Sequence, residues 1–228
     1  MPRIRLAFRQ DGPARFLGHL DVMRTFERAC RRAGLRPAYT QGFNPHPKMG
    51  FAAPLPVGMN GAREYVDLEL ESEAPAADVA AALARQLPAG LTVLGARPVE
   101  AGGSPLMGQL GRAHYRVTGR AANGEKWDDE RLRAAVERFL GRAEVFVTRR
   151  TGKGTKKKDI RPGIRSLRAR TDGETLILTM ELAAGRAGTV RPDEVLRALR
   201  EEAGLDLVGA EVWRTALLSG DGRLLWEC

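Results

Sequence analysis

The sequence predicts an α+β protein made of two ferredoxin-like units in tandem, each with an antiparallel sheet, and two observations carry this prediction. The stretch AGGSPLMGQLG at 101–111 is rich in small residues and has no charged residue before Arg112, as is typical of a linker. On either side of it, the hydrophobic periodicity gives one element order, β-α-β-β-α-β, which is the split-βαβ pattern. We therefore expect a first domain at 1–100, a linker at 101–111 and a second domain at 112–228.

The first domain begins with a strand at Arg3–Arg9, where basic and apolar residues alternate with period two. A helix is expected at His19–Ala33, because apolar residues recur at helical spacing, an acid lies in the first turn and Gly34 can end it. Prolines interrupt the apolar run Met49–Val57, which favours an edge strand. The remaining expected elements are the alternating strand Tyr65–Glu71, the amphipathic helix Ala77–Leu87 and the strand Leu91–Val99.

The second domain repeats this order. His114–Arg120 alternates as a strand does, and Asp128–Leu140 carries its apolar residues on one helical face. A short strand at Glu144–Thr148 is expected to lead into a basic loop. The last expected elements are a hairpin of Arg165–Arg170 and Thr175–Leu182 that turns at Thr171-Asp172-Gly173, a helix Pro192–Glu202 with proline in its first turn, and a strand Ala210–Leu217.

Residues 149–170 carry the whole net charge of the protein. The segment RRTGKGTKKKDIRPGIRSLRAR holds ten basic residues and one acid, Asp159, so its net charge is +9, which equals that of the chain. A local positive field with few acids suits a polyanion, most often nucleic acid. The alternative is a disordered, solvated loop. The expected nucleic-acid contacts are Arg149, Arg150, Lys153, Lys156, Lys157, Lys158, Arg161, Arg168 and Arg170.

This basic loop contains no aromatic residue, so base stacking would have to come from Phe146, Phe43 or Tyr39, and binding through the phosphate backbone fits best. Each domain also has one unusual loop in the same place, after its first helix. These loops are Gln41–Lys48, with the sequence QGFNPHPK, and Gly152–Gly163, and the repeat suggests that they form two halves of one composite site.

Other arginines have a structural interpretation. In the expected topology the first strand pairs antiparallel with the third, so Arg3, Arg5 and Arg9 lie opposite acids at Asp67, Glu69 and Glu71. Cross-strand ion pairs explain this arrangement. On the first helix, Arg24, Arg28 and Arg31 form a stripe that is a solvated face or, alternatively, a supplementary phosphate track.

Four residues are the candidates for catalysis, although none is assigned a role. His46 lies between two prolines that hold the backbone extended, and Lys48 follows it, as a general base or phosphate contact would require. The alternative for His46 is a turn histidine without chemistry. His19 and Asp21 open the first helix, where capping is the simpler explanation. If the Asn44–Lys48 loop folds back to that helix end, all four side chains cluster.

Composition excludes several classes of function. An apolar content of 43% and a charged content of 29% are ordinary for a soluble protein, and the start MPRIRLAFRQ does not have the pattern of a signal peptide. Cys30 and Cys228 do not make a disulfide scaffold, so a cytoplasmic location is expected. The sequence lacks CxxC, HxxxH, GxxxxGK[ST] and GxGxxG patterns, so we expect neither a bound metal nor a cofactor of its own.

Several motifs resemble a bacterial family of unknown function that is associated with radical SAM proteins. They are Arg15–Asp21 (RFLGHLD), Tyr39–Lys48 (YTQGFNPHPK), Leu55–Gly58 (LPVG) and Lys156–Pro162 (KKKDIRP), and the resemblance covers nearly the whole chain. Members of that family stand alone or form the C-terminal part of radical SAM proteins, some with a cobalamin-binding region. The resemblance therefore implies a radical SAM partner that carries an iron–sulfur cluster, S-adenosylmethionine and cobalamin.

Together these observations favour an RNA-binding accessory module that presents tRNA or rRNA to a radical SAM partner, rather than an enzyme in its own right. One alternative is a metal-independent RNA endonuclease in which His46 activates a ribose 2′-hydroxyl and Lys48 stabilises the developing charge. Another is a protein-interaction module whose basic loop docks on an acidic partner surface. The sequence does not decide the oligomeric state.

Overall fold

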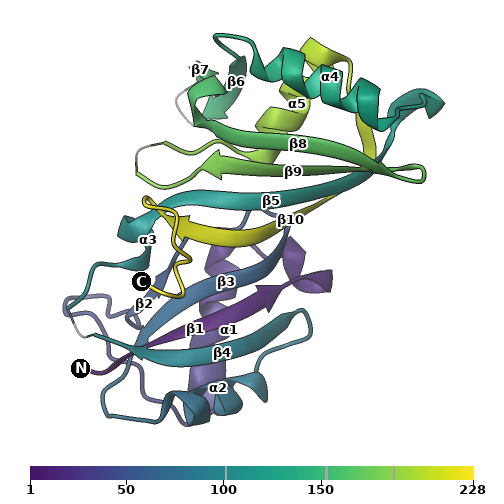
Figure 1. Ribbon diagram of the computed structural model, residues 1–228. Helices are drawn as coiled ribbons and strands as arrows, with labels where there is room; N and C mark the ends of the chain where they lie inside the picture. The colour runs from purple at the N-terminus through teal and green to yellow at the C-terminus, as the bar shows by residue number, and fades with distance from the viewer. Residues whose placement is uncertain (101, 152–153, 187) are drawn as a thin grey trace. The chain divides into compact units, whose positions relative to one another are not determined.

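The computed structural model describes residues 1–100, 102–151, 154–186 and 188–228. The chain forms two compact units (Figure 1). Unit one contains residues 1–110 and 214–228, and unit two contains residues 111–213. The final strand, β10 (Leu207–Ser219), contributes residues to each unit. Residues 214–228, which the sequence analysis assigned to the second domain, thus belong to the first unit.

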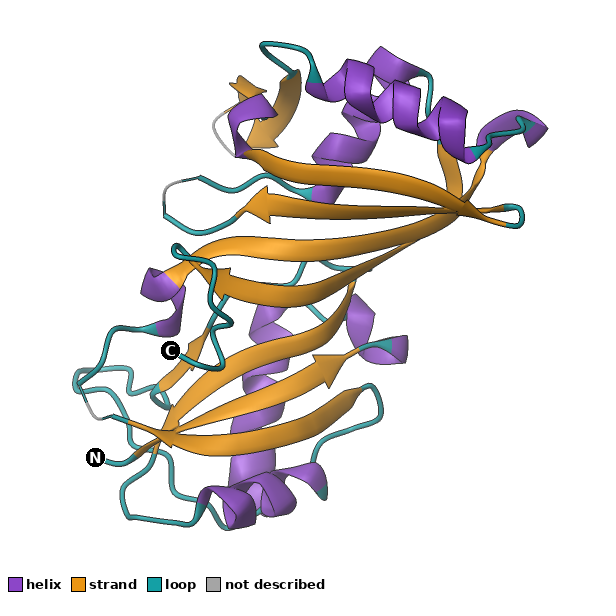
Figure 2. Ribbon diagram, in the orientation of Figure 1, coloured by secondary structure: helices purple, strands orange, loops and turns teal. Residues whose placement is uncertain are grey.

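Unit one has an antiparallel sheet in the order β4-β1-β3, with the short β2 paired to β3 and β10 also next to β3 (Figure 2). The expected strand Met49–Val57 is shorter than predicted, because it ends before Pro54 and Pro56, which have no N–H to donate. The elements of this unit are β1 (Arg3–Gln10), the 3-10 turn η1 (Gly12–Phe16), α1 (His19–Arg32), β2 (Met49–Phe51), β3 (Asn60–Glu69), α2 (Ala76–Ala84), β4 (Leu91–Val99) and α3 (Leu106–Gln109).

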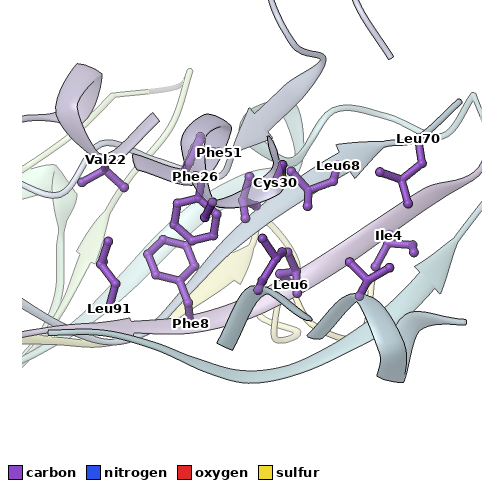
Figure 3. Close-up of a cluster of buried hydrophobic side chains, with 14 of the residues drawn as sticks. Ile4, Leu6, Phe8, Val22, Phe26, Cys30, Phe51, Leu68, Leu70 and Leu91 are labelled. Carbon is purple, nitrogen blue, oxygen red and sulfur yellow. The ribbon is translucent and has the colours of Figure 1, made fainter. Parts of the chain in front are cut away.

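The core of unit one lies between the sheet and α1 (Figure 3). Alternate residues of β1 point into it, and Phe8 packs edge-on against Phe26, with 5.0 Å between the ring centroids. Phe51 lies 5.6 Å from Phe26, also edge-on. The amphipathic pattern of His19–Ala33 is confirmed, since the buried residues of α1 are Val22, Phe26, Ala29 and Cys30.

The expected linker at 101–111 is largely structured. Residue 101 lies outside the described residues, but α3 follows closely, and its first residue, Leu106, is only 1% exposed. The next strand already begins at Leu110. Within 102–111, Leu106 and Leu110 become buried, and two apolar residues among small ones gave too weak a signal to predict structure from composition.

Unit two has strands in the order β10-β5-β9-β8, and β5, β9 and β8 pair antiparallel. Asp128 caps its first helix by accepting a 2.7 Å hydrogen bond from the backbone N–H of Arg131. Pro192 opens the second helix and Gly204 (φ +70°) ends it, as the sequence indicated for the start. The elements are β5 (Leu110–Ala121), η2 (Ala122–Gly124), α4 (Asp129–Leu140), β6 (Phe146–Thr151), β7 (Gly154–Asp159), η3 (Arg161–Gly163), β8 (Ile164–Asp172), β9 (Thr175–Ala183), α5 (Pro192–Ala203) and β10.

The basic segment differs from the predicted loop. Its first part forms a two-stranded hairpin, in which β6 and β7 pair from Phe146 opposite Asp159 to Thr151 opposite Gly154. Its last part is β8, which pairs with β9 at the end of the strand order. The expectation of a loop was wrong because Lys and Thr next to glycines give little strand signal on their own, whereas pairing with Phe146–Thr151 supplies the missing backbone hydrogen bonds.

The predicted α+β class with antiparallel pairing is confirmed. Among the helices of the described residues, none is long and apolar enough to cross a membrane.

Candidate nucleic-acid interface

Two cations of the β6–β7 hairpin are held by the protein itself. Val147 is 3% exposed, so the hairpin face that bears Val147 also turns Arg149 and Lys158 inward. Arg149 donates from Nε to Glu194 of α5 at 2.8 Å, and Lys158 Nζ donates to the carbonyl oxygen of Thr189 at 2.5 Å. We infer that these two side chains fasten the hairpin to α5 and contribute little to an outer charged surface.

Glu194 also takes part in the N-terminal cap of α5, which explains why it is buried. Its other carboxylate oxygen accepts from the backbone N–H of Arg191 at 2.9 Å, which completes a capping box at the start of α5. Burial, together with the nearby charge of Arg149, lowers the pKa of Lys158 against the opposing effect of Glu194. One acid therefore fixes both a helix start and the base of the basic hairpin.

The exposed lysines of the hairpin are Lys156, which lies opposite Arg149, and Lys157. Lys157 Nζ lies 4.1 Å from the ring centroid of Phe146, a residue that is itself 42% exposed. This pair places a charge beside an aromatic ring, and the role of Phe146 in base stacking stays a prediction. Lys153 and the side chain of Arg150 lie outside the described part of the structure.

Arg161 is also structural. Its Nε donates to the carbonyl oxygen of Leu140 at 2.9 Å, and a terminal nitrogen donates to the carbonyl oxygen of Ile164 at 3.3 Å. Leu140 is the last residue of α4, so the guanidinium satisfies a carbonyl that the helix leaves unpaired. Arg161 was predicted as a nucleic-acid contact, but in the structure its polar atoms serve to link α4 to β8.

The exposed arginines of β8 belong to a larger surface that the sequence analysis missed. In the paired strands, Arg168 lies opposite Thr179 of β9, and Thr179 lies opposite Arg116 of β5. Because side chains of directly paired residues share a face, the three form one row across the sheet. Arg170 and Arg120 lie on the same face by the two-residue period. We call Arg116, Arg120, Arg168 and Arg170 the open-face arginines; all four are exposed.

The helices lie on the other side of this sheet. Leu167, Val117 and Leu178 alternate with the open-face residues and are at most 4% exposed, and α4 packs against β8 (Figure 2). The sequence signal for the open face was the alternation of His114–Arg120, in which Arg116 and Arg120 fall on the polar side. It was overlooked because β5 has few charges compared with residues 149–170.

Two acids of β8 and β9 share this face, Glu181 and Asp172, which lies in the row of Arg120, and Glu181 is already neutralised. Glu181 accepts hydrogen bonds from Arg112 at 3.0 Å and from His114 at 3.2 Å. Burial alone would favour the neutral acid, but these two hydrogen bonds outweigh it and hold the pKa of Glu181 below its usual range. Within the described residues, Arg116, Arg120 and Arg168 have no ion-pair partner. The open face therefore carries an unbalanced positive charge.

The four candidate catalytic residues of unit one do not form a single cluster. His19 and Lys48 line the same cavity of about 400 Å³, in which Lys48 Nζ lies 3.1 Å from a carboxylate oxygen of Glu69. His46 and Asp21 are not among the residues that line it. His46 is exposed, and Asp21 forms a loose ion pair with Arg24 at 3.8 Å.

His19 is held by packing rather than by a polar partner. Its ring lies edge-on to Phe51, 5.4 Å between centroids, and burial lowers its pKa. In residues 1–100, 102–151, 154–186 and 188–228, no group of three or more His, Cys, Asp or Glu side chains is placed to hold a metal ion.

Residues 3–192 match the model of a family described as uncharacterized protein conserved in bacteria (DUF2344). The chain belongs to this family. The match contains the open-face arginines and the β6–β7 hairpin, as well as the QGFNPHPK segment. Among curated proteins, no sequence matches the chain.

The fold has relatives among solved structures. One chain of a crystal structure of a Cbf5-Nop10-Gar1 complex superposes with a TM-score of 0.53 and 12% sequence identity. The alignment covers 93% of the present chain and 48% of that chain, so our chain spans about half the length of this neighbour. At this identity the likeness concerns the fold.

Proposed function

We propose that this protein binds RNA through unit two, and the open-face arginines carry the proposal. Four exposed arginines lie on one face of the sheet, on β5 and β8 with β9 between them, and together they raise the positive potential of that face. Such a face is favourable when a polyanion neutralises it. The β9 residues between these strands are Thr179, between Arg168 and Arg116, and Ile177, opposite Arg170, and neither is aromatic, so the face suits phosphates and 2′-hydroxyls more than bases.

Arginine is the appropriate cation for such a surface. Its planar guanidinium can donate two parallel hydrogen bonds to one phosphate, which lysine cannot do. Adjacent strands lie about 4.8 Å apart, so the backbones of Arg168 and Arg116 are separated by about 10 Å. Lys156 and Lys157 extend the positive surface of the same unit on the β6–β7 hairpin.

We also propose that the units are tandem ferredoxin-like domains. The strand order β4-β1-β3-β2 in unit one and β10-β5-β9-β8 in unit two correspond when each unit's strands are numbered along the chain, with the hairpin β6–β7 as an insertion. Several RNA-binding modules use a sheet of this kind with one face open. This topology occurs in many unrelated proteins, so the function depends on the arginines.

The further role that we propose is accessory: the protein presents tRNA or rRNA to a radical SAM partner. Its own sequence has no CxxxCxxC for an iron–sulfur cluster, so the chemistry would be the partner's. This step is supported only by the resemblance of the motifs at 15–21 and 39–48. Co-purification of the tagged protein with and without ribonuclease treatment tests it, since a radical SAM protein should be recovered in the untreated sample.

The experiment for RNA binding measures fluorescence anisotropy of labelled tRNA at several KCl concentrations. The double variant R116E/R168E should weaken binding at least about tenfold and make the slope of log K against log[KCl] shallower by about one to two units. The control R138E/R200E makes the same change in charge at exposed positions of α4 and α5. Equal effects of the two double variants would contradict a specific interface.

A competition measurement separates RNA from an acidic protein partner. Unlabelled tRNA should displace the labelled RNA, whereas polyglutamate of equal charge should displace it poorly. If polyglutamate competes as well as tRNA and R116E/R168E abolishes its binding, the face is a docking site for acidic proteins and the RNA proposal is wrong.

A further inference from the structure

The sheet of unit one is covered on each of its faces. One face packs on α1, as described above, and the other is covered by residues 220–228, which Figure 1 shows in yellow in front of β3. Ala7, Tyr65 and Arg5 point to this second face and are each at most 1% exposed. In unit two the sheet face without helices is open. In unit one the corresponding face is covered by residues 220–228 of the same chain.

The second face has a recess the size of a planar ring. Ala7 pairs with Gly95 on β4 and with Tyr65 on β3, so two small residues lie beside a tyrosine in one row. A Cβ atom at Gly95 would lie 3.9 Å from the indole of Trp226. The small side chains therefore let an aromatic ring approach the sheet closely.

Trp226 fills this recess. Its ring is stacked on that of Tyr65, with 6.1 Å between centroids and 25° between planes. The guanidinium carbons of Arg63 and Arg97 each lie 5.6 Å from the centre of the indole. One tyrosine and two arginines around a flat ring are the side chains that proteins use to stack on a nucleic-acid base.

Two carbonyl oxygens of the same segment accept hydrogen bonds from arginines. Arg5 donates to the carbonyl oxygens of Leu225 and Cys228, the latter at 2.7 Å, and Arg97 also donates to Cys228. Arg5 keeps a second set of bonds to Asp67, at 2.8 and 3.1 Å, which orients it toward the segment. The recess thus binds a planar ring and, next to it, oxygen acceptors.

The segment does not satisfy the polar atoms that it covers. Of the buried side-chain atoms without a hydrogen-bond partner in the described residues, three lie at this recess: Nε of Arg63, Nε of Arg97 and the hydroxyl of Tyr65. Buried unpaired donors are unfavourable. A ligand with more oxygen acceptors than a peptide of this length offers would satisfy them better.

We propose that this recess is a binding site for one nucleotide of single-stranded RNA, and that Trp226–Cys228 occupies it when RNA is absent. Trp226 lies where the base would stack, and the carbonyl oxygen of Cys228 lies where a phosphate oxygen would accept from Arg5 and Arg97. Leu225 is fully buried and its backbone N–H donates to the carbonyl oxygen of Leu217, so it anchors the segment while Trp226–Cys228 moves aside. The inference rests on the proposed RNA binding and adds a second site, in unit one.

The test uses a labelled single-stranded pentauridylate and the full chain. If Trp226–Cys228 occupies the recess about nine-tenths of the time, W226A should bind the oligonucleotide about tenfold more tightly than the wild type, because the competitor is gone. Adding R97A to W226A should remove this gain. A thermal melt of each variant confirms that it is folded, and a variant that lacks residues 226–228 should reproduce the gain.

A second measurement uses the intact segment. In W127F/W213F the remaining tryptophan is Trp226, and saturating pentauridylate should shift its emission to longer wavelength as the ring enters water. The proposal is wrong if this shift is absent at saturation, if folded W226A shows no gain, or if the peptide Leu-Trp-Glu-Cys binds W226A as tightly as the oligonucleotide does. R116E/R168E should weaken tRNA binding yet leave the gain of W226A unchanged, so failure of one site is distinguishable from failure of the other.

Discussion

Arg214 and Glu64 form an ion pair that joins β10 to β3 inside unit one, and both side chains are almost wholly buried, at 3% and 4% exposed. Two guanidinium nitrogens bond the carboxylate, at 2.8 and 2.5 Å, and the remaining donors reach the carbonyl oxygens of Ala53 and Pro54. The same arginine thus satisfies the irregular, proline-rich backbone after β2 and the acid of β3.

Replacing Arg214 by methionine should destabilise the protein strongly. The change leaves the Glu64 carboxylate buried without its partner, which costs about 3–5 kcal/mol in comparable cases. Urea unfolding followed by tryptophan fluorescence measures this loss. The double variant E64Q/R214M should recover part of it, because no buried charge remains.

The control for this prediction is Arg31→Ala on α1. Arg31 pairs with Glu27 at 3.3 Å on an exposed helix surface, where such a pair contributes at most about 0.5 kcal/mol. If R214M were no more destabilising than R31A, the buried pair would have no special role.

The lysines of the basic hairpin should separate into two classes in RNA binding. Substituting glutamine for Lys156 and Lys157, which are exposed, should make the salt dependence of tRNA affinity shallower by about one unit for each phosphate that the variant no longer neutralises. Lys158→Gln should leave it unchanged, because the amine of Lys158 is bound to Thr189. If Lys158→Gln makes the salt dependence of tRNA affinity as shallow as Lys157→Gln does, Lys158 belongs to the interface instead.

Cys30 should resist alkylation in the native protein, whereas Cys228 should react. Burial raises the pKa of the Cys30 thiol to about 11, from 9.0, which reduces the reactive thiolate at pH 8 by about a hundredfold. Mass spectrometry after brief iodoacetamide treatment should find the label on Cys228, and on Cys30 only after unfolding in urea. Equal labelling of the two residues without urea would contradict the buried position of Cys30.

Stability should fall as the pH drops below about 6.5, in part because of His19. Burial lowers the pKa of His19 in the folded state, so the unfolded chain, with its ordinary value near 6.5, binds more protons in this window. Stability therefore rises with pH through the window and is lost on acidification. Comparing urea midpoints at pH 5.5 and 7.5 for the wild type and H19Q measures this component, which H19Q should reduce. H46Q serves as a control with the same change in histidine number.

RNA incubated with the protein in EDTA should stay intact. The endonuclease hypothesis needs His46 beside a free Lys48, but Lys48 is paired with Glu69 and His46 is not among the residues that line its cavity. Gel electrophoresis of labelled tRNA after incubation checks this. Cleavage that disappears in H46A would establish the enzymatic alternative.

Local patterns predicted the local parts of the fold well. The expected pairing of the first and third strands set Arg3, Arg5 and Arg9 opposite Asp67, Glu69 and Glu71, and the structure shows Arg5 opposite Asp67, bonded at 2.8 Å. The strand Leu91–Val99 was predicted with both ends correct, because turn-forming residues lie directly before it, at 88–90, and shortly after it, at 102–103. Helix α5 was placed to within one residue by its proline and acids. These features depend on a few adjacent residues, which a sequence displays directly.

The features that the sequence did not reveal depend on distant partners. The β6–β7 hairpin needs Glu194, about 45 residues further on, to hold Arg149. Arg116 becomes part of a charged surface only because β9 lies between it and Arg168. The cover on the second face of unit one comes from Trp226, which is stacked on Tyr65, a residue far away in the sequence. These long-range interactions decide which of the predicted basic residues are bonded within the protein and which remain available to a ligand.

The division of β10 between the units has a consequence for synthesis. Residues 1–110 leave the ribosome first, but the edge of β3 and the second face of its sheet stay uncovered until residues 214–228 have been made. At about 5–20 residues per second, the intervening 111–213 take roughly 5–20 s. During that interval the nascent first unit exposes an unpaired strand edge of the kind that recruits other chains. The unit that starts first is completed last, so its maturation is timed by the translation of the other unit.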